Sequence, residues 1–212
     1  MPEELVLYTN PRSRGAMARW MMEELGQPYR VELMAYGPPM RPPEFLALNP
    51  MGKVPVLTHG ARIVTEVAAI CAYLAGAFPQ ARLGPETPDE SARFWRWIFF
   101  AAGPVEAAVT HRAMGFEVPP DKRGLAGYGT PDLAIDTLEV AVSQSGWITG
   151  DRFTAADVYV GSHVAWGLMF GTLPDRPAFA AYRDRLVARP AWQRAAQMDT
   201  SDWDRMQTEA TP

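Results

Sequence analysis

Residues 5–26 read LVLYTNPRSRGAMARWMMEELG, and this stretch decides the fold of the first part of the chain. Its opening, Leu5–Tyr8, is continuously apolar, which is typical of a strand buried on both faces of a parallel sheet. Apolar residues then recur at the spacing of an amphipathic helix, at Met17, Trp20, Met21 and Leu25. Gly26 supplies the helix stop.

The next segments extend this strand and helix into a β-α-β, loop, β-β-α module. Residues 29–33 alternate as a strand does, and the proline-rich stretch 36–45 predicts a loop. NPMGKVPVL at 49–57 and ARIVT at 61–65 predict a hairpin. The apolar residues of a second amphipathic helix are Val67, Ile70, Cys71, Leu74 and Phe78.

A second module, rich in helix signals, begins after a segment of Pro, Gly and charged residues. We predict a first domain at 1–79, a linker at 80–88 and an all-helical domain at 89–212. A long helix over 93–116 should bend at Gly103-Pro104. The aromatic residues Trp95 and Trp97 lie early on this helix. They indicate either that it packs in the hydrophobic core or that it forms the wall of an apolar substrate pocket. The polar tail after Met198 should fray.

Composition limits the possible partners. The 212 residues are 48% hydrophobic and carry a net charge of −4, which argues against nucleic acid as a partner. No apolar run approaches the ~18 residues of a membrane span, and the N-terminus lacks the pattern of a signal peptide. The three histidines lack metal-ligand spacing, so we expect no metal. The single cysteine, Cys71, lies on an apolar helical stripe and fits a core thiol in a reducing cytoplasm.

Pro55 stands inside an apolar strand, where proline is normally excluded because it removes a ladder donor. One interpretation is a cis Val54-Pro55 bond at the strand start, which turns the N–H and C=O of Val54 outward to pair with an extended peptide. The other is a trans-proline in an edge strand.

Thr65 has the character of a helix N-cap. The N–H groups of Glu66 and Val67 would then form a carboxylate site at the positive end of the helix. The carboxylate of Glu66 would offer a partner for an ammonium group. The N–H groups and this carboxylate together suit the head group of an amino acid. The alternative is that Glu66 only favours the helix dipole.

Four hydrogen-bonding side chains lie between the first strand and the first helix: Tyr8, Thr9, Asn10 and Ser13. A hydroxyl of Ser13 or Tyr8 that donates to a thiolate would lower the pKa of the thiol. The alternatives are an N-cap for Ser13 and packing for Tyr8. In the helical module, Thr154 and Asp157 have the spacing of a capping box, which we interpret as structural.

Five segments appear in an order that resembles the soluble, cytosolic-type glutathione transferases, especially the bacterial members of the serine or cysteine type. They are LYTNPRSRGAMARWMMEELG, NPMGKVPVL, TEVAAICAYLA, FTAADVYVG and RPAWQRA. The resemblance covers almost the whole chain. It implies an α+β thioredoxin-like N-terminal domain, an all-α C-terminal domain and a homodimer of cytoplasmic subunits.

The resemblance also implies roles for individual residues. Val54, before the cis Pro55, would grip the cysteinyl part of glutathione, and Glu66 would meet its γ-glutamyl group. Lys53 falls where a contact to the glycyl carboxylate is often found. Val67 replaces the serine usual in the family, and the lost hydroxyl contact would cost roughly 1–3 kcal/mol.

The implied activity is conjugation of the glutathione thiolate to a small apolar electrophile, as in detoxification. The electrophile would lie in a cleft walled partly by the helix from Trp95 to Met114. Ser13 is the favoured activating residue, with Tyr8 and Asn10 as alternatives. Two rival functions are a glutathione-dependent thiol-disulfide reductase, favoured if Asn10 meets the sulfur, and a non-enzymatic binding protein, which Val67 keeps open.

Overall fold

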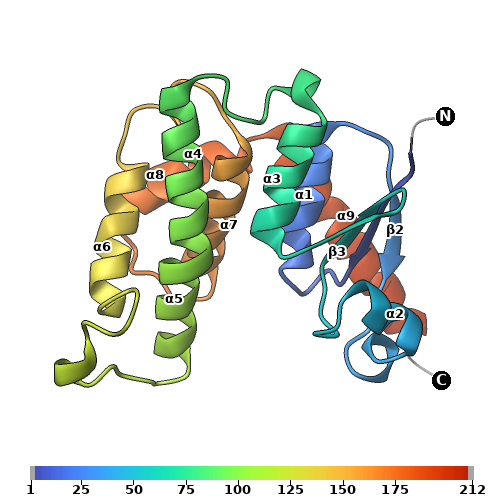
Figure 1. Ribbon diagram of the computed structural model, residues 1–212, viewed down its shortest axis with the longest axis horizontal. Helices are drawn as coiled ribbons and strands as arrows, with labels where there is room; N and C mark the ends of the chain where they lie inside the picture. Colours follow the sequence, from blue (N-terminus) through green and yellow to red (C-terminus); the bar gives the residue numbers. More distant parts are fainter. Residues whose placement is uncertain (1–2, 210–212) are drawn as a thin grey trace. The chain divides into compact units, whose positions relative to one another are not determined.

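The computed structural model describes residues 3–209. They form two compact units, which are drawn together in Figure 1. The first unit takes the residues up to Ala81 and those from Ala188 onward, and the second comprises Arg82–Val187. The chain therefore leaves the first unit once and later returns to it. Within the described part of the chain, no helix combines the length and the apolar character needed to cross a membrane.

The first unit is built on a four-stranded sheet in the order β2-β1-β3-β4. Its strands are β1 (Leu5–Thr9), β2 (Arg30–Leu33), β3 (Val56–His59) and β4 (Arg62–Thr65). The helices α1 (Gly15–Leu25) and α3 (Val67–Ala77) pack against them. β1 pairs in parallel with β2 and antiparallel with β3. This confirms the predicted thioredoxin-like module, and Gly26 ends α1 in the left-handed conformation (φ 68°).

The proline-rich segment predicted as a loop contains two short helical elements, η1 (Pro38–Met40) and α2 (Pro43–Leu48). Pro42 is the N-cap of α2 and Pro43 its first residue, where the missing N–H of proline costs nothing and its fixed φ suits a helix. Phe45 of α2 is buried in a cluster with Met40 and Val56. The prediction of a loop was wrong because these prolines begin a helix instead of breaking one.

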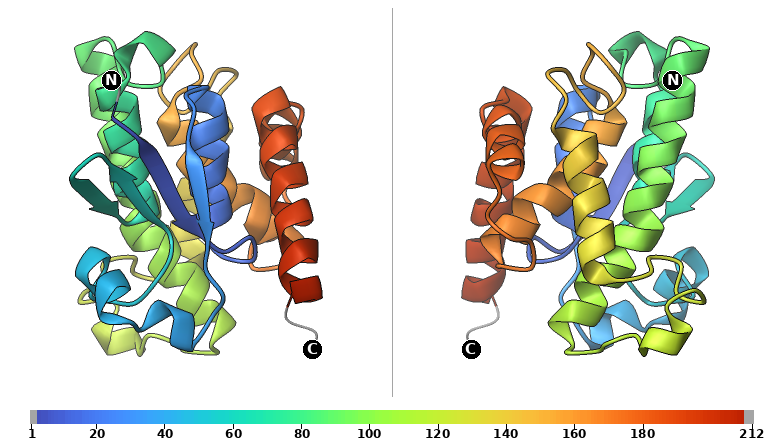
Figure 2. Two further views of the ribbon diagram at one scale, coloured as in Figure 1. Left: turned by 90° about the vertical axis from the view of Figure 1, so that its right-hand side faces the viewer. Right: turned by 90° about the vertical axis from the view of Figure 1, so that its left-hand side faces the viewer.

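The C-terminal segment forms one helix, α9 (Pro190–Glu209), which packs along α1 in the first unit (Figure 2). Arg189 pairs with Glu24 near the end of α1 through two bonds of 2.6 and 2.7 Å. The chain after Met198 stays helical to Glu209, so the expectation of fraying was wrong. In this structure α9 groups with the first unit.

A buried ion cluster explains why the polar half of α9 is ordered. The side chain of Arg19 on α1 is fully buried, and its guanidinium lies 3.1 Å from Asp199 and 2.7 Å from Asp202 of α9. Burial raises the pKa of Asp199 to about 7, although the charge of Arg19 lowers it. The aspartates that make this tail polar are thus the ones that fix it to α1.

The second unit is all helical, as predicted. Its elements are α4 (Pro88–Phe100), η3 (Ala101–Val105), α5 (Glu106–Ala113), η4 (Pro120–Lys122), α6 (Pro131–Val142), α7 (Ala155–Met169) and α8 (Pro177–Val187). η3 is a π-helical turn that contains Pro104 and joins α4 to α5 at the position where a bend was predicted. α7 is buried along most of its length, so it is the central helix of this unit.

The capping box at the start of α7 is present as predicted. Asp157 is fully buried, and its carboxylate accepts hydrogen bonds from the N–H (2.9 Å) and hydroxyl (3.1 Å) of Thr154. Its second oxygen accepts from the N–H of Ile148 and the hydroxyl of Tyr182, both at 2.8 Å. Burial raises the pKa of Asp157 to about 6, while these hydrogen bonds oppose the rise.

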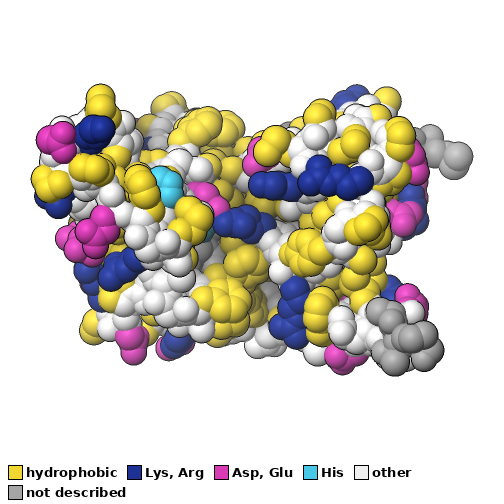
Figure 3. Space-filling view, turned by 90° about the horizontal axis from the view of Figure 1, so that it is seen from below, with side chains coloured by type: hydrophobic (Ala, Val, Ile, Leu, Met, Phe, Trp, Pro, Cys, Tyr) yellow, Lys and Arg dark blue, Asp and Glu magenta, His cyan; other side chains and the backbone are white. Residues whose placement is uncertain are grey.

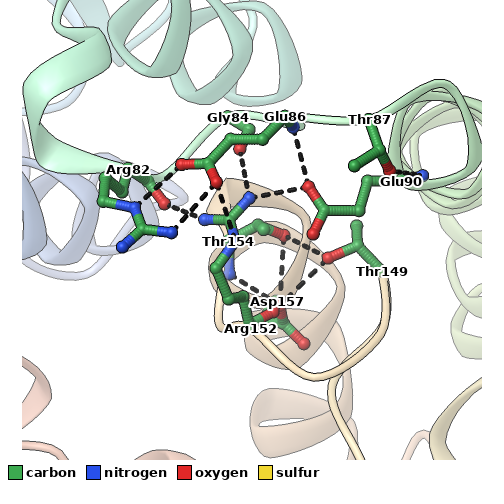
Figure 4. Close-up of polar contacts among 9 residues, drawn as sticks. All are labelled: Arg82, Gly84, Glu86, Thr87, Glu90, Thr149, Arg152, Thr154 and Asp157. Atoms are coloured by element: carbon green, nitrogen blue, oxygen red, sulfur yellow. Dashed lines mark hydrogen bonds and ion pairs between the residues drawn. The ribbon is translucent and has the colours of Figure 1, made fainter.

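Next to this box, Arg152 fastens the segment that precedes α4 (Figure 4). Its guanidinium donates to the carbonyls of Arg82 and Gly84 and pairs with Glu90 at 2.7 Å. The N–H of Ala155 also donates to the carbonyl of Leu83 at 2.8 Å. Most of the predicted linker at 80–88 is therefore anchored on the second unit.

Candidate functional site

The register of the sheet brings the predicted site residues to one edge. Tyr8 of β1 lies opposite Val56 of β3, and Val56 lies opposite Thr65 of β4. Because β1 and β4 end here and β3 begins here, three segments must gather beside this row. They are the loop after Tyr8, the Val54-Pro55 bond and the start of α3. The sequence predicted each segment separately, and the pairing of the strands brings them together.

Ser13 lies in the tight turn between β1 and α1. Its hydroxyl donates to the carbonyl of Asn10 at 2.7 Å and accepts from the N–H of Gly15 at 2.9 Å. α1 begins at Gly15 with Arg14 as its N-cap residue, so the alternative role of Ser13 as N-cap is not the one observed. The half-buried hydroxyl must rotate away from the Asn10 carbonyl before it can donate to a sulfur atom.

The two alternatives to Ser13 have different surroundings. The side chain of Asn10 is almost fully buried, its amide donates to the carbonyl of Met34 at 2.8 Å, and its oxygen accepts from the N–H of Arg12 at 2.9 Å. Asn10 thus ties the turn to the end of β2. Tyr8 is half-buried, and its ring lies 6.1 Å from that of Phe45.

Gly15 and Thr9 form a close approach that sequence analysis missed. A Cβ atom on Gly15 would lie only 2.0 Å from Oγ1 of Thr9, which is fully buried. Within the described residues this hydroxyl has no hydrogen-bond partner. The glycine therefore lets the first turn of α1 sit directly on the end of β1. The position of Gly15 directly after Ser13-Arg14, at the start of the predicted helix, was the feature of the sequence that could have indicated this close approach.

Replacing Gly15 by alanine should lower the free energy of unfolding by about 2–3 kcal/mol, because the added methyl group enters a packed strand–helix contact. Urea unfolding measures this loss. Gly76→Ala is the matched control, because a Cβ on this α3 residue meets nothing within 4 Å. Removing the obstructing hydroxyl with Thr9→Ala should restore part of the loss in the double variant. A Gly15→Ala protein as stable as the wild type would contradict the close approach.

The Val54-Pro55 bond is cis, as in the first of the two interpretations, whereas the pairing of Val54 with a peptide stays a prediction. β3 begins only at Val56, so Pro55 stands before the ladder and takes no donor from it. Asn49 holds the approach to this bond by donating to the carbonyl of Lys53 at 2.8 Å. The side chain of Lys53 is exposed, and that of Val54 is half-buried.

The start of α3 differs from the prediction by one residue. Thr65 is the last residue of β4, and Glu66 is the N-cap of α3, so the expectation of a Thr65 cap was wrong. Glu66 has φ 66° and ψ 123°, a conformation that a non-glycine residue adopts rarely and that is often found at functional sites. The side chain of Glu66 is exposed and that of Val67 is buried.

Cys71 is the buried core thiol that the sequence predicted. Its side chain is fully buried in α3, and burial raises the pKa of the thiol to about 12. A neutral, inaccessible thiol does not act as a nucleophile. Among the described residues, no group of three or more His, Cys, Asp or Glu side chains is placed to hold a metal ion.

Comparisons with known proteins agree with this architecture. Residues 15–77 match the family model "Glutathione S-transferase, N-terminal domain". The chain is similar to the structure of a theta class glutathione S-transferase from Xanthomonas axonopodis pv. citri with glutathione bound. They are 29% identical with a TM-score of 0.73, over 92% of this chain and 98% of that one. This chain has the glutathione S-transferase fold.

Two curated relatives extend the comparison. Glutathione S-transferase GstB of Escherichia coli is 28% identical over 166 residues, 74% of this chain and 80% of the relative. Maleylacetoacetate isomerase of Pseudomonas aeruginosa is 29% identical over 209 residues, 92% of this chain and 97% of the relative. Both relatives match this chain over most of their own length.

Proposed function

We propose that the protein is a glutathione transferase of the bacterial serine type that joins the thiolate of glutathione to a small apolar electrophile. The observation that carries this proposal is the meeting of three segments at one sheet edge, set by the row Tyr8–Val56–Thr65. One segment suits a thiolate, one suits an extended peptide and one suits a carboxylate. Glutathione presents these three groups in one molecule.

Each part of glutathione has a proposed partner. The backbone of Val54, turned outward by the cis bond, pairs with the cysteinyl residue. The first N–H groups of α3, beginning at Val67, receive the γ-glutamyl carboxylate, and exposed Glu66 receives its ammonium group. Lys53 extends its ammonium group toward the glycyl carboxylate. The buried side chain of Val67 offers no hydroxyl here, so the carboxylate depends on the backbone donors alone.

Ser13 activates the sulfur in this proposal. Its hydroxyl exchanges the Asn10 carbonyl for the thiolate, which is the stronger acceptor, and the N-terminal turn of α1 adds favourable partial charge. Both effects favour the ionised thiol and lower its pKa. The thiolate then forms a bond to carbon of the electrophile, and the leaving group departs with the electron pair.

Asn10 is the feature that separates this proposal from the reductase alternative. That alternative requires the second N–H of the Asn10 amide to meet the sulfur, but Asn10 is almost fully buried, and its other N–H and its oxygen hold the turn. The burial of Asn10, beside the half-buried Ser13, therefore favours the transferase.

We further propose that the protein acts as a homodimer in the cytoplasm. Trp95 and Phe99 of α4 are 43% and 67% exposed, and their rings lie 6.0 Å apart. Ile63 of β4 is also exposed. Figure 3 shows hydrophobic side chains at the surface beside arginine and lysine on one face. Exposed aromatic side chains of this size are typical of residues covered in an assembly.

The test is a pH titration of the ultraviolet absorbance of the thiolate in bound glutathione, with free glutathione as reference. We expect the bound thiol to ionise at least about one pH unit lower, and Ser13→Ala to abolish most of this shift. The kcat/KM for a chlorodinitrobenzene substrate should fall roughly 10- to 100-fold, as for a lost hydrogen bond to a charged group. Tyr8→Phe should change neither quantity.

Three other results would point elsewhere. If Tyr8→Phe removes the shift, the tyrosine is the activating residue. If glutathione binds with an unshifted thiol, the reductase or carrier alternatives gain support. If millimolar glutathione does not bind, the transferase proposal fails.

A further inference from the structure

Arg12 precedes Ser13 and is held from three directions. Its N–H donates to the side chain of Asn10 at 2.9 Å, and its carbonyl accepts from the hydroxyl of Tyr36 at 3.0 Å. Its guanidinium lies over the ring of Trp203, 5.1 Å from the ring centroid. The first contact comes from the turn itself and the second from the segment that follows β2. The third contact comes from α9.

α9 places the Trp203 ring firmly. The neighbouring Asp202 pairs with the buried guanidinium of Arg19 at 2.7 Å, so this turn of α9 is fixed on the middle of α1. The contact with the Trp203 ring places the Arg12 guanidinium against this helix, where its positive charge lowers the pKa of Asp199. A residue near the end of the chain is thus in contact with the loop that carries the proposed activating serine.

We propose that Trp203 is a positioning residue for the thiolate site, acting through Arg12 on the Asn10–Ser13 turn. The inference rests on the proposed function, because Ser13 must be the group that meets the sulfur. Since a cation–π contact at a partly exposed position shifts an equilibrium roughly 2- to 30-fold, its loss should release the turn in part of the population. The Ser13 hydroxyl would then be less often in place to donate.

The experiment measures the pKa of bound glutathione thiol and kcat/KM in the full chain. Trp203→Ala should reduce the thiol shift and lower kcat roughly 3- to 10-fold, with a smaller change in KM, because the pairing at Val54 is untouched. Arg12→Gln should reproduce both effects. The double variant should be no worse than the more severe single variant, because both changes remove one contact. Trp203→Phe keeps an aromatic face and should stay close to the wild type.

Arg194→Gln is the matched control. Arg194 also lies on α9 and pairs with Glu23 of α1 at 2.9 Å, but at the end of α1 away from Ser13. It should leave the thiol pKa unchanged.

The inference is overturned if Trp203→Ala and Trp203→Phe both keep the wild-type thiol pKa. It is also overturned if Arg194→Gln moves the pKa as much as Trp203→Ala does, because the effect would then be a general loosening of α9. A loss in Arg12→Gln without a loss in Trp203→Ala would show that Arg12 acts by its charge alone. Failure of the proposed function is distinct, because the wild type itself would show no shift.

Discussion

Asp157→Ala should lower the free energy of unfolding by about 3–5 kcal/mol, the largest loss we expect from a single substitution in the second unit. The buried carboxylate accepts four hydrogen bonds, from two groups of Thr154, from Ile148 and from Tyr182. Alanine leaves these donors without their acceptor and opens a cavity beside the central helix. Urea unfolding followed by circular dichroism measures the loss.

Asp157→Asn tests whether the stability lost in Asp157→Ala comes from the missing hydrogen-bond acceptors or from the missing volume. The amide keeps the volume but turns one acceptor into a donor, which then faces an N–H group. We expect an intermediate loss of about 2 kcal/mol. Asp132→Asn is the control, because Asp132 occupies the first turn of α6, another threonine-capped helix, and its side chain is 82% exposed. It should change stability by less than about 0.5 kcal/mol. An Asp157→Ala protein with unchanged stability would refute the structural role.

Arg19→Met should also lower the free energy of unfolding, by about 3 kcal/mol at pH 8, because it leaves two partly buried aspartates without their cation. The side chain of Arg19 is fully buried, and those of Asp199 and Asp202 are only 13% and 19% exposed. Methionine fills much of the space of the arginine stem, so the loss reports on charge more than on packing.

The loss should depend on pH with a definite sign. The folded-state pKa of Asp199, about 7, lies above its ordinary value of 3.8, so the native state holds this proton more tightly than the unfolded state. Wild-type stability from this group therefore falls as pH rises from about 4 to about 7. Arg19 lowers the pKa of Asp199, so its removal raises that pKa further. Arg19→Met should accordingly cost more at pH 8 than at pH 5.

Asp199→Asn supplies the control for this mechanism. Without the titrating carboxyl, the difference in stability between pH 5 and pH 8 should shrink by about 2–3 kcal/mol relative to the wild type. Asp204→Asn, an exposed site on the same helix, should leave the wild-type difference in place. If the Arg19→Met loss were equal at both pH values, Asp199 would not be the group that titrates.

Local patterns predicted most of the elements because their causes are local. The apolar spacing of residues 17–25, the stop at Gly26 and the Thr154–Asp157 box each act within a few residues. The conflict between proline and a strand ladder offered the cis bond before Pro55 as one of two interpretations. These features needed no knowledge of the rest of the chain.

The error at the C-terminal tail arose because a distant partner decides the structure there. Arg19 stands in a helix sequence where an arginine is normally solvated. Its burial depends on Asp199 and Asp202, about 180 residues later. The same pairing orders a tail whose polarity alone predicted fraying. The sequence shows that Ser13 precedes the first helix, but the hydrogen bond from its hydroxyl to the Asn10 carbonyl depends on the shape of the turn between β1 and α1.

The return of α9 to the first unit gives the chain an unusual order of assembly during synthesis. The strands and α1 emerge first from the ribosome, but the helix that covers α1 emerges only after the whole of the second unit. Until then, Arg19 and the α1 surface around it lack their cover. Domains made of one continuous segment can fold as they emerge, whereas this one stays incomplete until α9 has been synthesised. Deleting α9 would therefore damage the unit that contains β1 and α1.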